Sequence, residues 1–96
     1  MLHLIFQTQA DSAVLERMTA GDAAVFLESG VLGVLQRNPM AQALSATLED
    51  CHLYVLAEDM AIRGILASEL VPGLQIVDYA RLVRLTVEHA KIVSWN

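Results

Sequence analysis

An unbroken apolar run followed by a helical pattern is the clearest feature of the hydrophobic patterning along this chain. Residues 53–56 read LYVL, with no polar position, whereas a strand with one solvated face would alternate apolar and polar residues. The run therefore predicts a strand that is covered on both faces, as in a parallel sheet. Asp59 and Arg63 follow it at a spacing of four residues, on a predicted helix that Gly64 can end.

The rest of the chain repeats this alternation of strand and helix. Further strands are predicted at residues 2–6, 24–27, 74–77 and 92–95, with a helical turn at residues 31–35. Helices are predicted from Asp11 or Ser12 to about Ala20, from the Asn38-Pro39 pair to about Asp50, and from Tyr79 to His89. Asn38 and Asp78 are the predicted N-caps of the second and third of these helices, and Pro39 is the predicted first helical residue of the second. Strands that alternate with helices and short turns indicate an α/β fold with a mainly parallel sheet.

Two aromatic residues near the end of the chain need a place to pack. The last predicted helix is expected to have an apolar face of Tyr79, Leu82, Val83 and Thr86, and a solvated stripe of Arg81, Arg84 and Glu88. Trp95 is the only tryptophan and the penultimate residue, and a terminus frays unless it is tied down. Its ring is expected either in the core of its own chain or docked on another subunit, and Tyr79 is open to the same two readings.

The composition bounds the size of the molecule and its surroundings. With 96 residues the chain is expected to form one domain, residues 1–96, yet 55% of its residues are hydrophobic. A sheet covered on both faces accounts for part of this apolar excess. Apolar surface covered by partner subunits is the second explanation, and the two are compatible.

Charge and cysteine content exclude several classes of function. The net charge is −5 and the six Lys and Arg residues form no cluster, so direct binding to nucleic acid is not expected. No apolar run approaches the ~20 residues of a membrane span, and the first residues lack the pattern of a signal peptide. A single cysteine cannot form an internal disulfide, which suits a cytoplasmic protein.

The single thiol, Cys51, is the first candidate for chemistry, as a reactive cysteine. It follows Glu49 and Asp50 and lies between the end of a predicted helix and the start of a strand. Carboxylates and the negative end of a helix raise the pKa of a thiol, and ligands of open α/β sheets gather at the opposite, carboxyl ends of the strands. The sequence therefore favours a structural role for Cys51.

No other residues form a recognisable catalytic or cofactor site in the sequence. His3, His52 and His89 lack the spacing of metal ligands, and there is no glycine-rich phosphate loop, so no metal or cofactor is expected. The segment Glu28-Ser29-Gly30 follows a predicted strand, but its serine has no base at a recognisable spacing. The adjacent carboxylates Glu58 and Asp59 are expected to cap a helix start and to interact with its dipole.

Four stretches together resemble the TusB/DsrH family, the small subunits of sulfur-relay complexes. They are MLHLIF at the start, AAVFLESGV around residue 26, LYVLAEDMAIRGI from residue 53, and VDYARLVRLTVEHAKIVSW at the end. These stretches span nearly the whole chain in order, and residues 35–51 match least. The resemblance implies a three-layer α/β/α domain with a mainly parallel sheet of four to five strands, like the subunits of DsrEFH complexes.

The resemblance also implies partners and a pathway. Family members assemble with TusC/DsrF-like and TusD/DsrE-like subunits into a dimer of heterotrimers, a heterohexamer, whose main sulfur-carrying cysteine is on the TusD/DsrE-like subunit. TusBCD relays sulfur toward 2-thiouridine at the tRNA wobble position, and DsrEFH serves in sulfur oxidation. DsrH-type chains carry a cysteine in the first helix, at about the place of Val14 here. This departure favours a TusB-like role, and Cys51 does not stand at the family position.

The sequence therefore predicts a non-catalytic subunit of a sulfurtransferase complex, with Glu28, Ser29, Tyr79 and Trp95 as interface residues. Three alternatives stay open beside it. One is a stand-alone, self-associating binding module of the same fold, and another is a DsrH-like subunit in sulfur oxidation. The third is an enzyme that uses Cys51 as a sulfur carrier.

Overall fold

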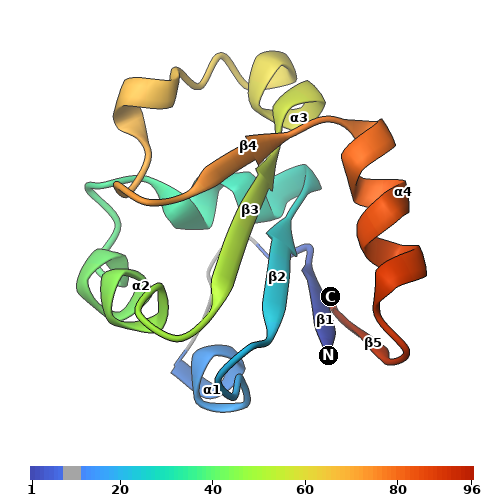
Figure 1. The fold of residues 1–96 in the computed structure, drawn as a ribbon. Helices are drawn as coiled ribbons and strands as arrows, with labels where there is room; N and C mark the ends of the chain where they lie inside the picture. Colours follow the sequence, from blue (N-terminus) through green and yellow to red (C-terminus); the bar gives the residue numbers. More distant parts are fainter. Residues whose placement is uncertain (8–11) are drawn as a thin grey trace.

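A parallel sheet of five strands forms the centre of the computed structural model, which describes residues 1–7 and 12–96 (Figure 1). Its strands are β1 (Leu2–Ile5), β2 (Ala23–Phe26), β3 (His52–Leu56), β4 (Gln75–Val77) and β5 (Ile92–Trp95). They lie in the order β4-β3-β2-β1-β5, and each neighbouring pair is parallel. The predicted α/β fold with a mainly parallel sheet is confirmed.

Helices cover both faces of this sheet and make the domain three-layered (Figure 1). They are α1 (Ser12–Glu16), the 3₁₀ helix η1 (Glu28–Val34), α2 (Ala41–Thr47), α3 (Ala57–Ile62), the 3₁₀ turn η2 (Ala67–Glu69) and α4 (Tyr79–Glu88). The larger buried cluster joins one sheet face to α1, η1, α2 and α3, through residues such as Val14, Val34, Leu44 and Met60. On the other face, Leu82 and Leu85 of α4 are the helical side chains that pack against the strands among the described residues.

The apolar run at residues 53–56 is buried from both sides, as its pattern predicts. Leu53 and Val55 belong to the cluster under α2 and α3, whereas Tyr54 and Leu56 belong to the cluster under α4. All four residues are buried, and the most exposed of them, Tyr54, is only 6% exposed. Alternate side chains of a strand point to opposite faces, so a strand with helices on both sides has no solvated position.

The predicted start of one helix and the predicted end of another are wrong, and a polar side chain explains each difference. The Asn38 side chain accepts a hydrogen bond from the backbone N–H of Met40 (2.9 Å), which makes a turn, and α2 begins only at Ala41. In α1 the helix ends at Glu16, because residues 19–22 turn around the Asp22 carboxylate, which accepts from the N–H of Thr19 (3.0 Å). The alternative N-cap Asp11 lies outside the described residues.

The predicted cap of the last helix is confirmed, and its removal gives a first prediction. Asp78 precedes α4 and accepts a hydrogen bond from the N–H of Arg81 (2.9 Å). We expect Asp78→Ala to lower the free energy of unfolding by about 0.5–2 kcal/mol, because an N–H at the helix start loses its acceptor. Denaturant melts measure this difference. Asp50→Ala is the control, because the Asp50 carboxylate is exposed and accepts no hydrogen bond from the residues that the structure describes. If the two variants lost the same free energy of unfolding, Asp78 would not act as a cap.

The described part of the chain contains no helix that is both long enough and apolar enough to cross a bilayer.

Candidate functional site

The four predicted interface residues all lie at the carboxyl edge of the sheet, but they do not form one site. Glu28 follows β2 after one residue, Tyr79 follows β4 after one residue, and Trp95 is the last residue of β5; Ser29 comes next after Glu28. Because β4 and β5 are the two outer strands, Tyr79 and Trp95 stand at opposite ends of this edge. The segment after β2 lies between them.

The segment after β2 is held by the first turn of α3. Glu28 has a positive φ of 52°, and its backbone N–H donates to Oδ2 of Asp59 (2.6 Å), whose side chain is buried. Glu58 likewise accepts from the backbone N–H of Tyr79 (3.3 Å), at the start of α4. Both carboxylates lie in the first turn of α3, as predicted, but the backbone N–H groups that they accept from belong to the starts of η1 and α4.

Asp59 lies in α3 as predicted, whereas Arg63 is the residue just after its last turn, and the two side chains do not form an ion pair. Arg63 donates to the backbone carbonyl of Asp59 at 3.5 Å, because the Asp59 carboxylate already binds Glu28. The sequence showed the adjacent carboxylates but not their acceptor roles, since both hydrogen bonds join segments more than 20 residues apart.

The apolar face predicted for α4 is only half correct. Leu82 and Thr86 of the predicted face are partly buried, whereas Leu85, the residue of α4 that is buried against the sheet, does not belong to the predicted face. In contrast, Tyr79 and Val83 are 52% and 59% exposed, and Val87, which was not assigned to this face, is 80% exposed. The helix is apolar over a wider arc than the sheet can cover, so one side of it stays in contact with solvent.

Trp95 packs against its own chain, in a polar network that the sequence did not predict. Its indole N–H donates to Nδ1 of His3 (3.1 Å), and Nε2 of His3 lies 3.1 Å from Oδ2 of Asp22. The guanidinium group of Arg17 lies 5.8 Å from the centre of the Trp95 ring. His3 interrupts the first apolar run, which is a sign in the sequence of a polar group within a buried strand. Nothing in the sequence links this histidine to Asp22 or Trp95.

The hydrogen bonds of this network assign the tautomer of His3. An indole N–H can only donate, so Nδ1 of His3 accepts, and the imidazole proton lies on Nε2 and is donated to Asp22. A His–Asp pair is also the arrangement of a general base and its orienting group. Here both ring nitrogens are engaged and His3 is 1% exposed, so the pair holds β1, β5 and the turn before β2 together and presents no nitrogen to a substrate.

Asp22 is the charged centre of this network. Besides His3, it accepts hydrogen bonds from the backbone N–H of Thr19 (3.0 Å) and from the amino group of Met1 (3.2 Å). Burial acts to raise the pKa of this carboxyl, but these hydrogen bonds and the charge of the amino group lower its pKa to about 2. Asp22 is therefore ionised throughout the physiological pH range.

Cys51 lies where the sequence predicted, between α2 and β3 at the amino edge of the sheet. The thiol is buried and donates to the backbone carbonyl of Thr19 at 3.2 Å. Burial, together with the negative charges of Asp22 and Asp50, raises the pKa of the Cys51 thiol. The thiolate is the reactive form of cysteine, and this setting disfavours it.

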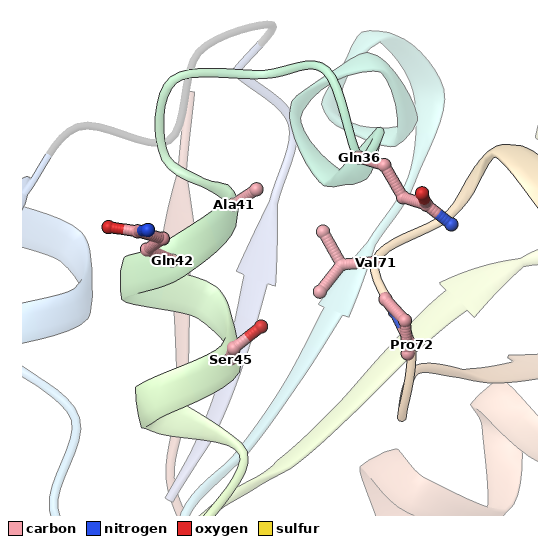
Figure 2. A pocket seen from close by; sticks show the side chains of 6 residues that line it. All are labelled: Gln36, Ala41, Gln42, Ser45, Val71 and Pro72. Carbon is pink, nitrogen blue, oxygen red and sulfur yellow. The ribbon is translucent and has the colours of Figure 1, made fainter.

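Three shallow grooves mark the surface around α2. One, of about 300 Å³, separates α2 from the segment before β4, with Ser45 and Val71 facing each other across it (Figure 2). Gln36 at its rim points away from α2, since its amide donates to the carbonyls of Ser68 and Leu70. The other two lie between α1 and α2, and one of them reaches Cys51. None of the grooves gathers a set of convergent charged groups.

Metal-ligating side chains are also dispersed. Within residues 1–7 and 12–96, no group of three or more His, Cys, Asp or Glu residues is placed to hold a metal ion.

Comparison with known proteins relates the chain to one family. Residues 5–92 match the family model described as "DsrH like protein". Protein TusB of Erwinia tasmaniensis is 34% identical over 88% of this chain and 85% of that protein. Protein TusB of Pectobacterium parmentieri is 33% identical over 99% of this chain and 100% of that protein.

Two solved structures share the fold. A protein of unknown function from Methanobacterium thermoautotrophicum superposes with a TM-score of 0.77 over 98% of this chain and 96% of that one, at 12% identity. A Thermotoga maritima protein superposes with a TM-score of 0.62 over 95% and 97% of the two chains, at 16% identity. At these identities, the likeness concerns the fold alone.

Proposed function

The chain belongs to the family of DsrH-like proteins, and on this premise we propose that it is a non-catalytic subunit of a sulfur-relay complex. Its relatives named TusB support a TusB-like place in that relay, which leads to 2-thiouridine at the tRNA wobble position. The partners would be TusC/DsrF-like and TusD/DsrE-like subunits, in the cytoplasm. The chain would contact tRNA only through the assembly, since its own net charge is −5.

The observation that carries the non-catalytic role is the setting of Cys51. A sulfur carrier must present a thiolate that takes the outer sulfur atom of a donor persulfide, and must then expose its own persulfide to the thiolate of an acceptor. The Cys51 thiol is instead buried and has a raised pKa. It also lies at the amino edge of the sheet, away from the edge where ligands of such folds bind. The position that corresponds to the DsrH-type cysteine is held by Val14, which is 1% exposed.

We expect the complex reconstituted with Cys51→Ser to transfer persulfide sulfur to an acceptor thiol within about twofold of the wild-type rate, because no step uses this thiol. The same TusC-like and TusD-like chains without this subunit are expected to lose at least about tenfold in rate or to fail to assemble. Labelled sulfur measured on each subunit reports the transfer directly.

Two results would contradict this proposal in different ways. A hundredfold loss in the Cys51→Ser complex with intact assembly would make Cys51 a carrier and the chain an enzyme. Full transfer without the chain, together with no association, would remove it from the relay and favour the stand-alone module.

A further inference from the structure

The exposed side of α4 forms a continuous apolar stripe, which we define as Tyr79, Val83 and Val87. A spacing of four residues places these side chains in one row along the helix, and they are 52%, 59% and 80% exposed. At 1.5 Å per residue, the row runs for about 12 Å. The sheet takes up Leu82 and Leu85 on the neighbouring side of α4, so none of the described strands covers the stripe.

The stripe lies beside the most basic part of an acidic chain. Residues 79–91 contain Arg81, Arg84 and Lys91 but only one carboxylate, Glu88, whereas the whole chain has six Lys and Arg against eleven Asp and Glu. Glu88 already lies 4.0 Å from Arg81. Arg84 and Lys91 are exposed and have no ion-pair partner among the residues that the structure describes. The stripe therefore has positive groups beside Val83 and Val87, whereas the carboxylates of Asp78 and Glu58 lie at its amino-terminal end, beside Tyr79.

This charge distribution argues against a second copy of the chain as the occupant. A two-fold interface brings the same patch together from both subunits, so the basic side chains beside Val83 would face their own copies. When two α4 helices pack antiparallel about Val83, the two Arg84 side chains stand directly opposite each other. Parallel packing would instead align two helix dipoles. A different protein surface with carboxylates at its rim would avoid both the repulsion between arginines and the alignment of two helix dipoles. Like charges that face each other across an interface disfavour binding of the wrong partner.

Nucleic acid does not fit this surface either. Three basic side chains in a chain of net charge −5 are few for phosphate binding, and the two valines of the stripe offer nothing to a phosphate backbone. The valines do suit an apolar protein surface, which would remove them from water.

We propose that the outward face of α4 docks a different polypeptide, whose contact surface has an apolar centre and a rim of Asp or Glu. This inference rests on the proposed subunit function and deepens it, because it assigns the docking face and the chemistry of the partner surface. The apolar row supplies the affinity, and Arg84 and Lys91 supply the choice of partner and accelerate association.

Sedimentation velocity with the purified TusC-like and TusD-like chains tests the docking face. Val87→Asp places a charge in the stripe, and Ile62→Asp is the matched control, because Ile62 on α3 is 77% exposed. We expect Val87→Asp to weaken binding at least about tenfold and Ile62→Asp to change it less than about twofold. Thermal melts monitored by circular dichroism verify that both variants keep the fold.

Charge reversal tests the chemistry of the rim. Arg84→Glu is expected to weaken binding at least about threefold at about 0.05 M NaCl and much less at about 0.5 M, since salt screens exposed charges. The exposed Arg37→Glu changes the net charge equally and is expected to have little effect.

The outcomes separate this inference from the function on which it rests. Wild-type affinity in Val87→Asp would overturn the docking face and leave the subunit function standing. A homodimer of the chain alone that Val87→Asp abolishes would make a second copy the occupant and overturn the proposal. If the wild-type chain binds neither partner, the subunit function fails, and the assignment of this face falls with it.

Discussion

Replacing Gly30 with alanine is expected to lower the free energy of unfolding by about 3 kcal/mol or more. Gly30 is buried in η1, and a Cβ atom built on it falls on the backbone carbonyl oxygen of Ile5, far inside van der Waals contact. A backbone atom cannot rotate away as a flexible side chain can, so η1 and the end of β1 would have to separate. Overpacking of a core costs about 1–3 kcal/mol, and more when the backbone must move.

Gly64 provides the matched control for this substitution. It has a positive φ of 66°, and a Cβ atom there would meet no atom within 4 Å. Gly64→Ala is therefore expected to cost only the conformational penalty of the left-handed region, about 1–2 kcal/mol. Urea melts of both variants measure the two losses. Equal losses would contradict the close approach of η1 to β1.

Removal of the charge at Asp22 is expected to produce the second large effect, and that effect depends on pH. At neutral pH we expect Asp22→Asn to be less stable than wild type by about 2–4 kcal/mol, because Thr19, His3 and the amino group of Met1 lose a buried charged acceptor. The part of the wild-type free energy of unfolding that this ionised carboxylate contributes should be lost in acid.

The sign and the pH window follow from the pKa shift. Folding lowers the pKa of Asp22 from 3.8 to about 2, so the unfolded chain takes up a proton first as the pH falls. The carboxylate therefore contributes its full stabilisation above pH 4 and loses it as the pH falls through about 2. The shift corresponds to about 2 kcal/mol.

Melts of wild type and Asp22→Asn at several pH values isolate this contribution from the other carboxylates. The difference in stability between the two proteins is expected to shrink by about 2 kcal/mol between pH 5 and pH 2. A difference that stays constant over this range would show that Asp22 is not ionised within a stabilising network.

The sequence by itself determined the strands and the α/β class. Leu53 to Leu56 predicted a doubly covered strand because the reason is local: a strand buried on both faces has no place for a polar side chain. The cap at Asp78 was also predictable, since its acceptor and its donor are three residues apart. The structural role of Cys51 could be inferred in part from Asp50, its neighbour in sequence.

Only the tertiary structure decided features that depend on contacts between distant segments. The order of the strands placed Tyr79 and Trp95 at opposite ends of the sheet edge. The Trp95–His3–Asp22 network joins residues up to 92 positions apart, and no periodicity encodes such a contact.

The face of α4 shows the same limit most clearly. The sequence specified an apolar arc on this helix, but the amount of the arc that the sheet could cover depended on where α4 crosses it. The structure buries Leu85 and leaves Val83 exposed, although both are apolar residues of one helix. Hydrophobic periodicity measures how much apolar surface a helix carries, whereas tertiary packing determines which part of that surface the chain itself removes from water.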